Sequence, residues 1–446
     1  MLGLLKLTHV RGARSPLRSM LLLGALLCGA AQAQMNIVVT QYNVRPIPVA
    51  IVPFGWQGTG APAYDVAGVV TADLGNSGRF APIKVADMVS KPTQPTQVNF
   101  QDWRVLDVDA LVIGQLSQTA PGRYAAVFQL FDVPSGEQRL GFRLEGGQQD
   151  LRAMSHQISD MVFEKLTGIK GVFSTQIAYV SEEQRPDKTK RYRLIVSDAD
   201  GENANVVADS PQPLMSPAWS PDARRLAYVS FEGNQSAVYV QTLRSGMREK
   251  VSGRPGVNGS PSFSPDGREL TITRSDDKGN LDVFALDTST QALRQLTTDS
   301  GIDTEASWSP DGRTIYFTSD RAGSAQIYKQ GTASGARPER VSFENTYNAH
   351  PRVSPDGKQI AVQYGQNNTF RIGVFDVANR EFRGLTDGKL DESPSFAPNG
   401  AQIIYATKDG NRGVLASVST DGRIKQRIAS VSGDVREPVW GPFPRP

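Results

Sequence analysis

The sequence is poor in the residues from which cross-links and many active sites are built. Its 446 residues include one cysteine, Cys28, and three histidines. No intramolecular disulfide can form, so we expect a hydrophobic core to hold the fold together, and a chain of this length can bury a large one. The sequence contains no Gly-x-Ser-x-Gly nucleophile motif and no complete Asp-x-Asp-x-Asp-Gly calcium loop. We therefore predict no catalytic residue, no bound metal and no cofactor.

Long apolar runs are also scarce. The main one, residues 20–30, is shorter than the roughly 20 residues that a helix needs to cross a bilayer. Four basic residues precede it and Ala31-Gln32-Ala33 follows it, an order that is typical of a secretory signal peptide. We predict that residues 1–33 are a signal peptide, cleaved near Ala33, and that the mature chain is exported.

Neither sign of charge is in excess. The chain has 48 lysines and arginines and 45 aspartates and glutamates, and four of the basic residues lie in the predicted signal peptide. The remaining chain therefore carries a net charge of −1, which argues against a nucleic-acid-binding surface. Glycine, with 42 residues, and proline, with 28, are abundant, and this composition favours a turn-rich β protein.

A repeated motif dominates the second half of the chain. In its fullest copies a bulky residue is followed by Ser-Pro-Asp-Gly, and the proline of this motif recurs with steps of 44, 45, 45, 43 and 44 residues. The six prolines are Pro221, Pro265, Pro310, Pro355, Pro398 and Pro442. A period of this length is typical of the blades of a β-propeller.

The motif itself suits a tight turn between two strands. Ser-Pro-Asp-Gly favours a type I turn, in which the proline presets φ and the glycine accepts a positive φ. Ala223 stands in place of the glycine in the first copy, at an expected cost of about 1 kcal/mol. We expect the bulky residue before each turn to lie on a short strand and to face the next blade. These bulky residues are Trp219, Phe263, Trp308, Val353, Phe396 and Trp440.

The sixth copy stops just after its turn and can supply only one strand. Its missing partners lie upstream, where Ile177-Ala-Tyr-Val-Ser is similar to Leu226-Ala-Tyr-Val-Ser and begins a set of three strands. We therefore predict that residues 173–446 form an all-β six-bladed β-propeller. Its N- and C-terminal strands would share one blade and close the ring, which leaves no open sheet edge between the blades.

Residues 34–172 lack the motif, and their apolar pattern alternates between strand and helix periods. We predict an α/β N-terminal domain with a flexible arm at residues 34–45 and an exposed loop at residues 88–101. The expected strands are residues 47–52, 110–114, 124–131 and 138–144, and the expected helices are residues 64–78 and 150–166, the second capped by Gly168. His156 would lie on the polar side of the second helix.

Four segments carry a resemblance to a known family. They are Arg45-Pro-Ile-Pro-Val-Ala-Ile-Val-Pro-Phe, Asp73-Leu-Gly-Asn-Ser-Gly-Arg-Phe, Phe163-Glu-Lys-Leu-Thr-Gly-Ile-Lys-Gly and Ser210-Pro-Gln-Pro-Leu-Met-Ser-Pro-Ala-Trp. With the repeats, they make the mature chain resemble the TolB family of the periplasmic Tol-Pal system. The resemblance implies a monomeric, non-enzymatic adaptor that supports outer-membrane integrity and constriction at cell division. Its propeller would bind the lipoprotein Pal and some colicins, and its N-terminal arm the C-terminal domain of TolA.

The resemblance also implies which residues bind Pal. Thr304 and Glu305 match propeller positions that the family uses for this contact, and Asn258 and Gly259 match the equivalent loop of the preceding repeat. The chain departs from the family pattern in that loop, because Val257 stands in place of a histidine. This change bears on the specificity of the face.

The register of the repeat extends the predicted Pal face. Six residues hold the same position in successive repeats, and we expect them to ring one face: Ser216, Ser260, Glu305, His350, Ser393 and Glu437. Ser260 replaces an alanine of the family pattern, and we include it in the predicted face with His350 and Glu437. The predicted TolA-binding arm is Gln34, Met35, Asn36, Ile37, Val38 and Val39.

Two other functions stay open from the sequence. An exported propeller enzyme would need acids, bases or metal ligands that converge on the channel, and a cell-wall carbohydrate-binding module would need exposed aromatic residues on the blade loops. Most large aromatic residues fall in the strand positions of the repeat, which favours the adaptor. The fold alone does not decide between these functions.

Overall fold

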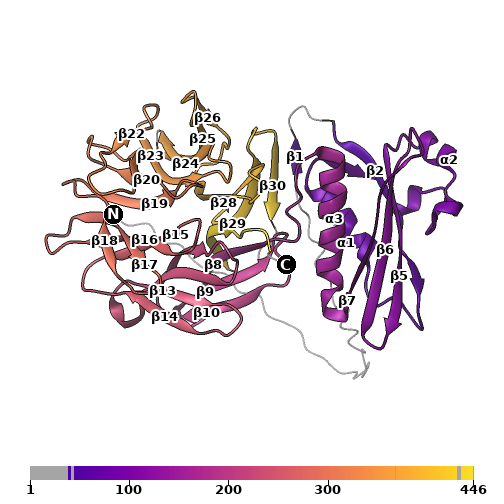
Figure 1. Ribbon diagram of the computed structural model, residues 1–446, viewed down its shortest axis with the longest axis horizontal. Coiled ribbons are helices and arrows are strands. Elements are labelled where there is room, and N and C mark those ends of the chain that lie inside the picture. Colours follow the sequence, from indigo (N-terminus) through magenta and orange to yellow (C-terminus); the bar gives the residue numbers. More distant parts are fainter. Residues whose placement is uncertain (1–38, 42–44, 367, 429–432, 445–446) are drawn as a thin grey trace, which may run out of the picture. The chain divides into compact units, whose positions relative to one another are not determined.

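The computed structural model in Figure 1 describes residues 39–41, 45–366, 368–428 and 433–444. These residues belong to one compact unit by their internal contacts. The described chain begins with a mixed α/β region and continues into a run of four-stranded antiparallel sheets. The predicted fold class, an α/β domain followed by a six-bladed β-propeller, is confirmed. The boundary between residues 172 and 173 stays a prediction.

The α/β region is built on one mixed sheet with the strand order β4-β2-β5-β6-β7, in which β3 also pairs with β5. Its N-terminal strands pair in parallel, and β5, β6 and β7 pair antiparallel. The strands are β2 (Ile47–Ile51), β3 (Gly55–Gln57), β4 (Phe80–Pro82), β5 (Ala110–Ala120), β6 (Arg123–Asp132) and β7 (Gln138–Gly147).

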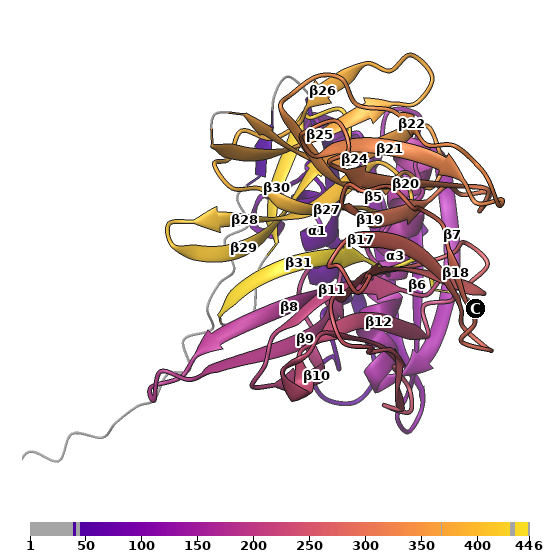
Figure 2. The same cartoon turned by 90° about the vertical axis from the view of Figure 1, so that its left-hand side faces the viewer.

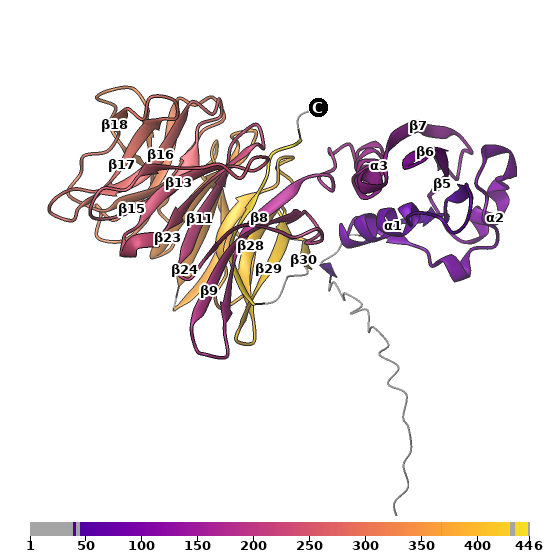
Figure 3. The ribbon, with the colours of Figure 1, turned by 90° about the horizontal axis from the view of Figure 1, so that it is seen from below.

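Two helices cover one face of this sheet, and a short helix lies on the other (Figure 3). Helices α1 (Val66–Asn76) and α3 (Leu151–Thr167) share a buried core with one set of alternating strand residues. Helix α3 ends at Gly168, whose φ of 72° gives the left-handed C-cap that the sequence predicts. Helix α2 (Phe100–Val105) packs on the opposite face through Trp103.

One local prediction in this region holds only in part, and another is wrong. Residues 88–101 are not simply an exposed loop, because Met88 is buried beneath it and the short helix η2 (Pro95–Gln97) and the start of α2 lie within it. His156 does not lie on a solvent-facing side of α3, since only 2% of it is exposed. The face that reads as polar packs against α1, which presents the buried carboxylate of Asp73.

The remaining short 3-10 helices are η1 (Val85–Asp87) and η3 (Gln148–Asp150) in the α/β region and η4 (Glu232–Asn234) in the propeller.

Six sheets of four propeller strands each follow in the described part of the chain. In chain order of their innermost strands, the first three are β11 (Leu214–Trp219), β12 (Arg225–Ser230), β13 (Ala237–Thr242) and β14 (Arg248–Ser252); β15 (Asn258–Phe263), β16 (Glu269–Ser275), β17 (Leu281–Asp287) and β18 (Leu293–Gln295); and β19 (Asp303–Trp308), β20 (Thr314–Ser319), β21 (Gln326–Gly331) and β22 (Glu339–Arg340).

The next two blades complete the regular series. They are β23 (Tyr347–Val353), β24 (Gln359–Gln366), β25 (Thr369–Asp376) and β26 (Phe382–Gly384), and β27 (Glu392–Phe396), β28 (Gln402–Asp409), β29 (Arg412–Ser419) and β30 (Ile424–Ile428). A fifth strand, β1 (Val39–Gln41), is added to the edge of the last blade, where it pairs antiparallel with β30.

The remaining blade closes the ring with strands from both ends of the propeller, as predicted. It combines β8 (Gln176–Gln184), β9 (Lys190–Asp198) and β10 (Asn205–Ser210) with β31 (Asp434–Trp440), and Figure 2 shows these strands side by side. The register places Ile177 opposite Trp440 and Ser181 opposite Val435. Because β31 takes the innermost position, the strand of this blade that lines the channel is equivalent to the innermost strands of the other blades.

The bulky residues before the turns pack against the preceding blade, not the next one as the sequence led us to expect. The indole Nε1 of Trp308 donates to the carbonyl oxygen of Ser262 at 3.1 Å, and that of Trp219 donates to Val439 at 3.3 Å. Strand alternation predicts that these side chains share one face, but not which neighbour that face meets. The turn positions behave as expected, and Ala223 takes a φ of 60° where the four following copies have glycine with a positive φ.

Candidate partner-binding site

Six β-bulges surround one end of the propeller channel. Every innermost strand shifts its register at the equivalent place, one to three residues after it begins to pair. The residue at each bulge has a positive φ although none is glycine: Ser216 (50°), Ser260 (46°), Glu305 (60°), His350 (53°), Ser393 (55°) and Glu437 (49°). Bulges redirect side chains, and backbone strain of this kind concentrates at functional sites. The register of the repeat thus correctly groups these six residues.

The bulges border a cavity of about 410 Å³. Four residues of the predicted Pal face line it, namely Ser260, Glu305, His350 and Glu437. A cavity of this volume falls within the range of small-molecule sites and can also receive a side chain of a protein partner.

Glu305 and His350 form an ion pair across neighbouring blades inside this cavity. Glu305 Oε1 lies 2.9 Å from His350 Nε2, and its Oε2 accepts hydrogen bonds from the His350 backbone N–H at 3.0 Å and the Thr318 hydroxyl at 2.8 Å. Burial disfavours the ionised carboxylate, but the charge of His350 and these hydrogen bonds outweigh it and lower the pKa of Glu305 to about 2. Burial also opposes protonation of His350, whose pKa the Glu305 carboxylate nonetheless raises.

Two further charged residues face the same space. Glu437 accepts a short hydrogen bond from the backbone N–H of Ser216 on the neighbouring blade, while burial raises the pKa of its carboxyl group. Arg352 lies two residues beyond His350 on β23 and also lines the cavity, and burial lowers the pKa of its guanidinium group. Arg352 also lines a second cavity of about 350 Å³, which the prolines and aromatic residues of the turns surround.

The other three residues of the predicted Pal face do not line the cavity. The Asn258 side chain is buried and holds its own loop, because its Nδ2 donates to the carbonyl oxygens of Ser236 at 3.0 Å and Arg254 at 2.8 Å. The Thr304 hydroxyl lies 3.0 Å from that of Thr273 on the adjacent blade. Gly259 precedes the bulge and is half-buried. These residues shape the mouth, and their side chains are not among those lining the cavity.

Three exposed aliphatic side chains lie beside the bulges, and the sequence had drawn attention only to Val257 among them. Met215 is 39% exposed, Val257 46% and Ile302 44%, and each lies within three residues before a bulge. Val257 and Ile302 hold the same position relative to Ser260 and Glu305, a signal that the repeat alignment contains. Apolar side chains around a charged cavity are typical of a protein interface.

The predicted arm is only partly described. Gln34, Met35, Asn36, Ile37 and Val38 lie outside the described residues. Val39 begins strand β1, which pairs antiparallel with β30 so that Val39 lies opposite Gln426 and Gln41 opposite Ile424. The described end of the arm is therefore bound to the outer edge of a propeller blade through its backbone. No helix of the described residues is both long and apolar enough to cross a bilayer.

Comparisons with known proteins cover both regions. A family model described as the TolB amino-terminal domain matches residues 35–139, and one described as the TolB beta propeller domain matches residues 163–444. The Tol-Pal system protein TolB of Xanthomonas campestris pv. campestris (strain B100) and that of Xanthomonas axonopodis pv. citri (strain 306) are each 45% identical over 437 residues, which is 96% of this chain and 99% of theirs. The crystal structure of TolB from Acinetobacter baumannii superposes with a TM-score of 0.83 at 38% identity, covering 92% of this chain and 100% of that one.

Proposed function

The chain belongs to the TolB family of the Tol-Pal system, and from this premise we propose that it is a periplasmic, non-enzymatic adaptor between Pal and TolA. Pal would bind at the bulge end of the propeller channel, and TolA would capture the N-terminal arm. The adaptor would thereby support outer-membrane integrity and constriction at division. The observation that carries the proposal is the cavity holding the Glu305–His350 pair inside an apolar rim.

The rim and the cavity supply different parts of a protein interface. Met215, Val257 and Ile302 offer apolar area that a partner can cover. The bulge residues are held by the sheets behind them, so little conformational entropy is lost when a partner docks. Glu305 and His350 add a charged pair at the centre, where binding energy concentrates in most interfaces.

The electrostatics of the cavity favour binding over catalysis. Both carboxylate oxygens of Glu305 already accept hydrogen bonds or face His350, and its pKa of about 2 makes it a poor proton acceptor. Burial opposes protonation of His350, but Glu305 raises its pKa, which favours the protonated form relative to an ordinary imidazole. A general base for hydrolysis would need the opposite environment.

The arm supplies a route by which the two partners influence each other. Strand β1 adds to the edge of β30 by backbone pairing, the same kind of bond by which extended peptides bind to sheet edges in complexes. If TolA takes the arm, that pairing is lost. Any coupling between arm and channel must then be reciprocal, and such couplings usually change affinities by 5- to 150-fold.

Calorimetric titration of the mature chain with purified Pal tests the channel. We expect binding that Glu305→Ala and Thr304→Ile each weaken by about tenfold or more. The matched control is Lys358→Ala, at a side chain 80% exposed beside a turn at the other end of the innermost strands, and it should bind Pal like the unchanged protein. A folded protein that fails to bind Pal, or equal losses in all three variants, would disprove the proposed face.

Deletion of residues 34–43 tests the arm. Capture by the C-terminal domain of TolA should disappear, while the propeller still binds Pal with an affinity shifted by the lost coupling. Retained TolA capture would show that another surface of the chain makes this contact.

A further inference from the structure

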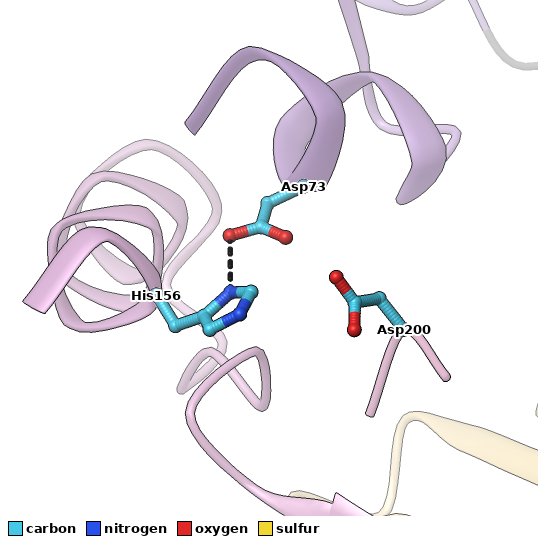
Figure 4. A group of neighbouring side chains, drawn as sticks. All are labelled: Asp73, His156 and Asp200. Atoms are coloured by element: carbon cyan, nitrogen blue, oxygen red, sulfur yellow. Dashed lines mark hydrogen bonds and ion pairs between the residues drawn. The ribbon is translucent and has the colours of Figure 1, made fainter. Parts of the chain in front are cut away.

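A buried polar cluster lies away from the channel, where helices α1 and α3 approach the turn between β9 and β10. Asp73 comes from α1, His156 from α3, and Asp200 from the turn, and Figure 4 shows their polar ends turned toward one another. They offer one nitrogen and two carboxylate oxygens that lie within 4.8 Å of one another. Nothing in the adaptor function described above uses these residues.

His156 has one nitrogen occupied and one without a partner. Its Nδ1 lies 2.8 Å from Asp73 Oδ2, which also accepts a hydrogen bond from the Ser159 hydroxyl at 2.6 Å. Its Nε2 is fully buried and has no hydrogen-bond partner; the Asp198 carboxylate, at 3.8 Å, is too distant for one. Buried polar atoms are nearly always satisfied, so an unpaired imidazole nitrogen in such a place has room for a partner such as a water or a metal ion.

The charges around His156 do not balance. Among the described residues, Asp73, Asp198 and Asp200 supply three carboxylates, and Arg152 is the basic side chain besides His156 that contacts them, through Nε to Asp198 at 3.0 Å and through Nη2 to Asp200. With a neutral imidazole the group therefore carries a charge of −2, within a region that is largely shielded from water. A divalent cation would cancel this charge.

There is also room for an ion. A cavity of about 40 Å³ adjoins two of these carboxylates, those of Asp73 and Asp200, and Asn76, Gln402 and Gln426 are among its other lining residues. A space of this size holds one or two waters or a single ion with a water. The amide oxygens of Asn76, Gln402 and Gln426 are available to complete a coordination shell, whereas Val172, Phe173, Ile428 and Trp440 form an apolar part of the lining.

We propose that His156, Asp200 and Asp73 form a site for a divalent transition metal such as Zn²⁺. One imidazole and carboxylate oxygens are a ligand set that Zn²⁺ accepts. A carboxylate that holds the second nitrogen of a metal-binding histidine, as Asp73 Oδ2 holds His156 Nδ1, is the usual device for orienting the ring. Because the ligands come from α1, α3 and a propeller turn, the bound ion would tie the helices to the propeller. The site does not rest on the proposed adaptor function.

Calorimetric titration of the metal-stripped full-length mature protein with Zn²⁺ tests the site. We expect one ion per chain, and His156→Gln and Asp200→Asn should each weaken its binding at least tenfold. His350→Gln is the matched control, because His350 is the other described histidine and also faces a carboxylate. This variant should keep the full affinity. A rise in melting temperature with Zn²⁺ that the two cluster variants lose gives a second readout.

Three results would overturn the proposal. They are no measurable binding of Zn²⁺ by the folded protein, unchanged binding in Asp200→Asn, and loss of binding in His350→Gln. Asp200 lies in a half-buried turn, so its variant covers the case in which His156→Gln does not fold. Neither measurement involves Pal or TolA, so the result is independent of the outcome for the adaptor.

Discussion

The chain uses the same chemical pair, a histidine facing a carboxylate, in two different environments. In the channel, Glu305 and His350 are 2.9 Å apart, and 18% and 31% of their side chains are exposed. In the helical cluster, Asp73 and His156 are 2.8 Å apart, and only 3% of either side chain is exposed. The distances are alike, so the difference lies in what surrounds each pair.

The surroundings indicate that the Glu305–His350 pair belongs to a binding surface, whereas the Asp73–His156 pair connects elements within the fold. The channel pair connects two neighbouring blades and opens into a cavity that a partner can enter. The cluster pair connects two helices and leaves an imidazole nitrogen buried and unpaired. Perturbed ionisable groups are therefore no sufficient mark of a binding surface, and accessibility has to be considered with them.

The largest difference between the two pairs should appear in stability. His156→Ala removes the partner of a buried carboxylate and leaves a void, so we expect the free energy of unfolding to fall by about 3 kcal/mol. His350→Ala leaves Glu305 near water in the cavity and should cost about 1 kcal/mol or less. Urea denaturation followed by circular dichroism compares the two. Equal losses would contradict the distinction drawn from burial.

Pal binding should show the reverse order. His350→Ala removes a charged side chain from the cavity wall, and we expect the dissociation constant for Pal to rise by about tenfold, or ~1.4 kcal/mol. Asp73→Asn changes the buried pair without touching the cavity and should leave Pal binding within twofold, provided that the variant is folded. A loss of Pal binding in Asp73→Asn alone would place the functional pair in the helices.

The propeller was largely predictable from the sequence because the motif that defines a blade is repeated along the chain. A proline at nearly constant intervals, a turn glycine with positive φ and the match of Ile177 to Leu226 define six blades and the shared closing blade. The same repetition groups the six bulge residues before their geometry is known. It does not reveal that the bulky residues face the preceding blade, because that depends on the direction in which the blades follow one another.

The buried cluster could not be predicted in the same way. In the helical pattern of the sequence His156 lies on the polar side. Its neighbours Asp73 and Asp200 are distant in the sequence, and none of the three positions belongs to a repeated motif. Their meeting depends on how two helices and a propeller turn pack. Likewise, the sequence pattern does not predict α2, which begins at the end of the predicted loop at residues 88–101, because its one fully buried side chain, Trp103, is held by residues distant in the sequence.

The contribution of Glu305 and His350 to stability should depend on pH. We expect this effect to be smaller than those above, but its sign is defined. The pKa of His350 is raised above its ordinary 6.5, mainly by Glu305 against the effect of burial, with Arg352 opposing and Glu437 assisting. Its contribution to stability is therefore complete below pH 6.5 and is lost as the pH rises through the higher folded value. The contribution of Glu305 is present above its ordinary 4.5 and is lost as the pH falls toward about 2.

The stability difference between the unchanged protein and His350→Gln should therefore be greatest between about pH 4.5 and 6.5 and decline on either side. Urea denaturation at a series of pH values measures it, and Lys358→Ala serves as the control without this dependence. A difference that grows above pH 7 would mean that His350 is neutral in the folded chain.

The finest comparison uses the hydroxyl group that accompanies each pair. Ser159 donates to Asp73 Oδ2 at 2.6 Å and is fully buried, whereas Thr318, which is also buried, donates at 2.8 Å to Oε2 of Glu305, a residue that lines the cavity. Ser159→Ala should lower the free energy of unfolding by about 1 kcal/mol and leave Pal affinity unchanged. Thr318→Val should cost less stability, because water can replace the lost donor, and weaken Pal binding about twofold by loosening Glu305. If Thr318→Val costs more stability than Ser159→Ala, the channel pair supports the joint between its blades more than it serves a partner.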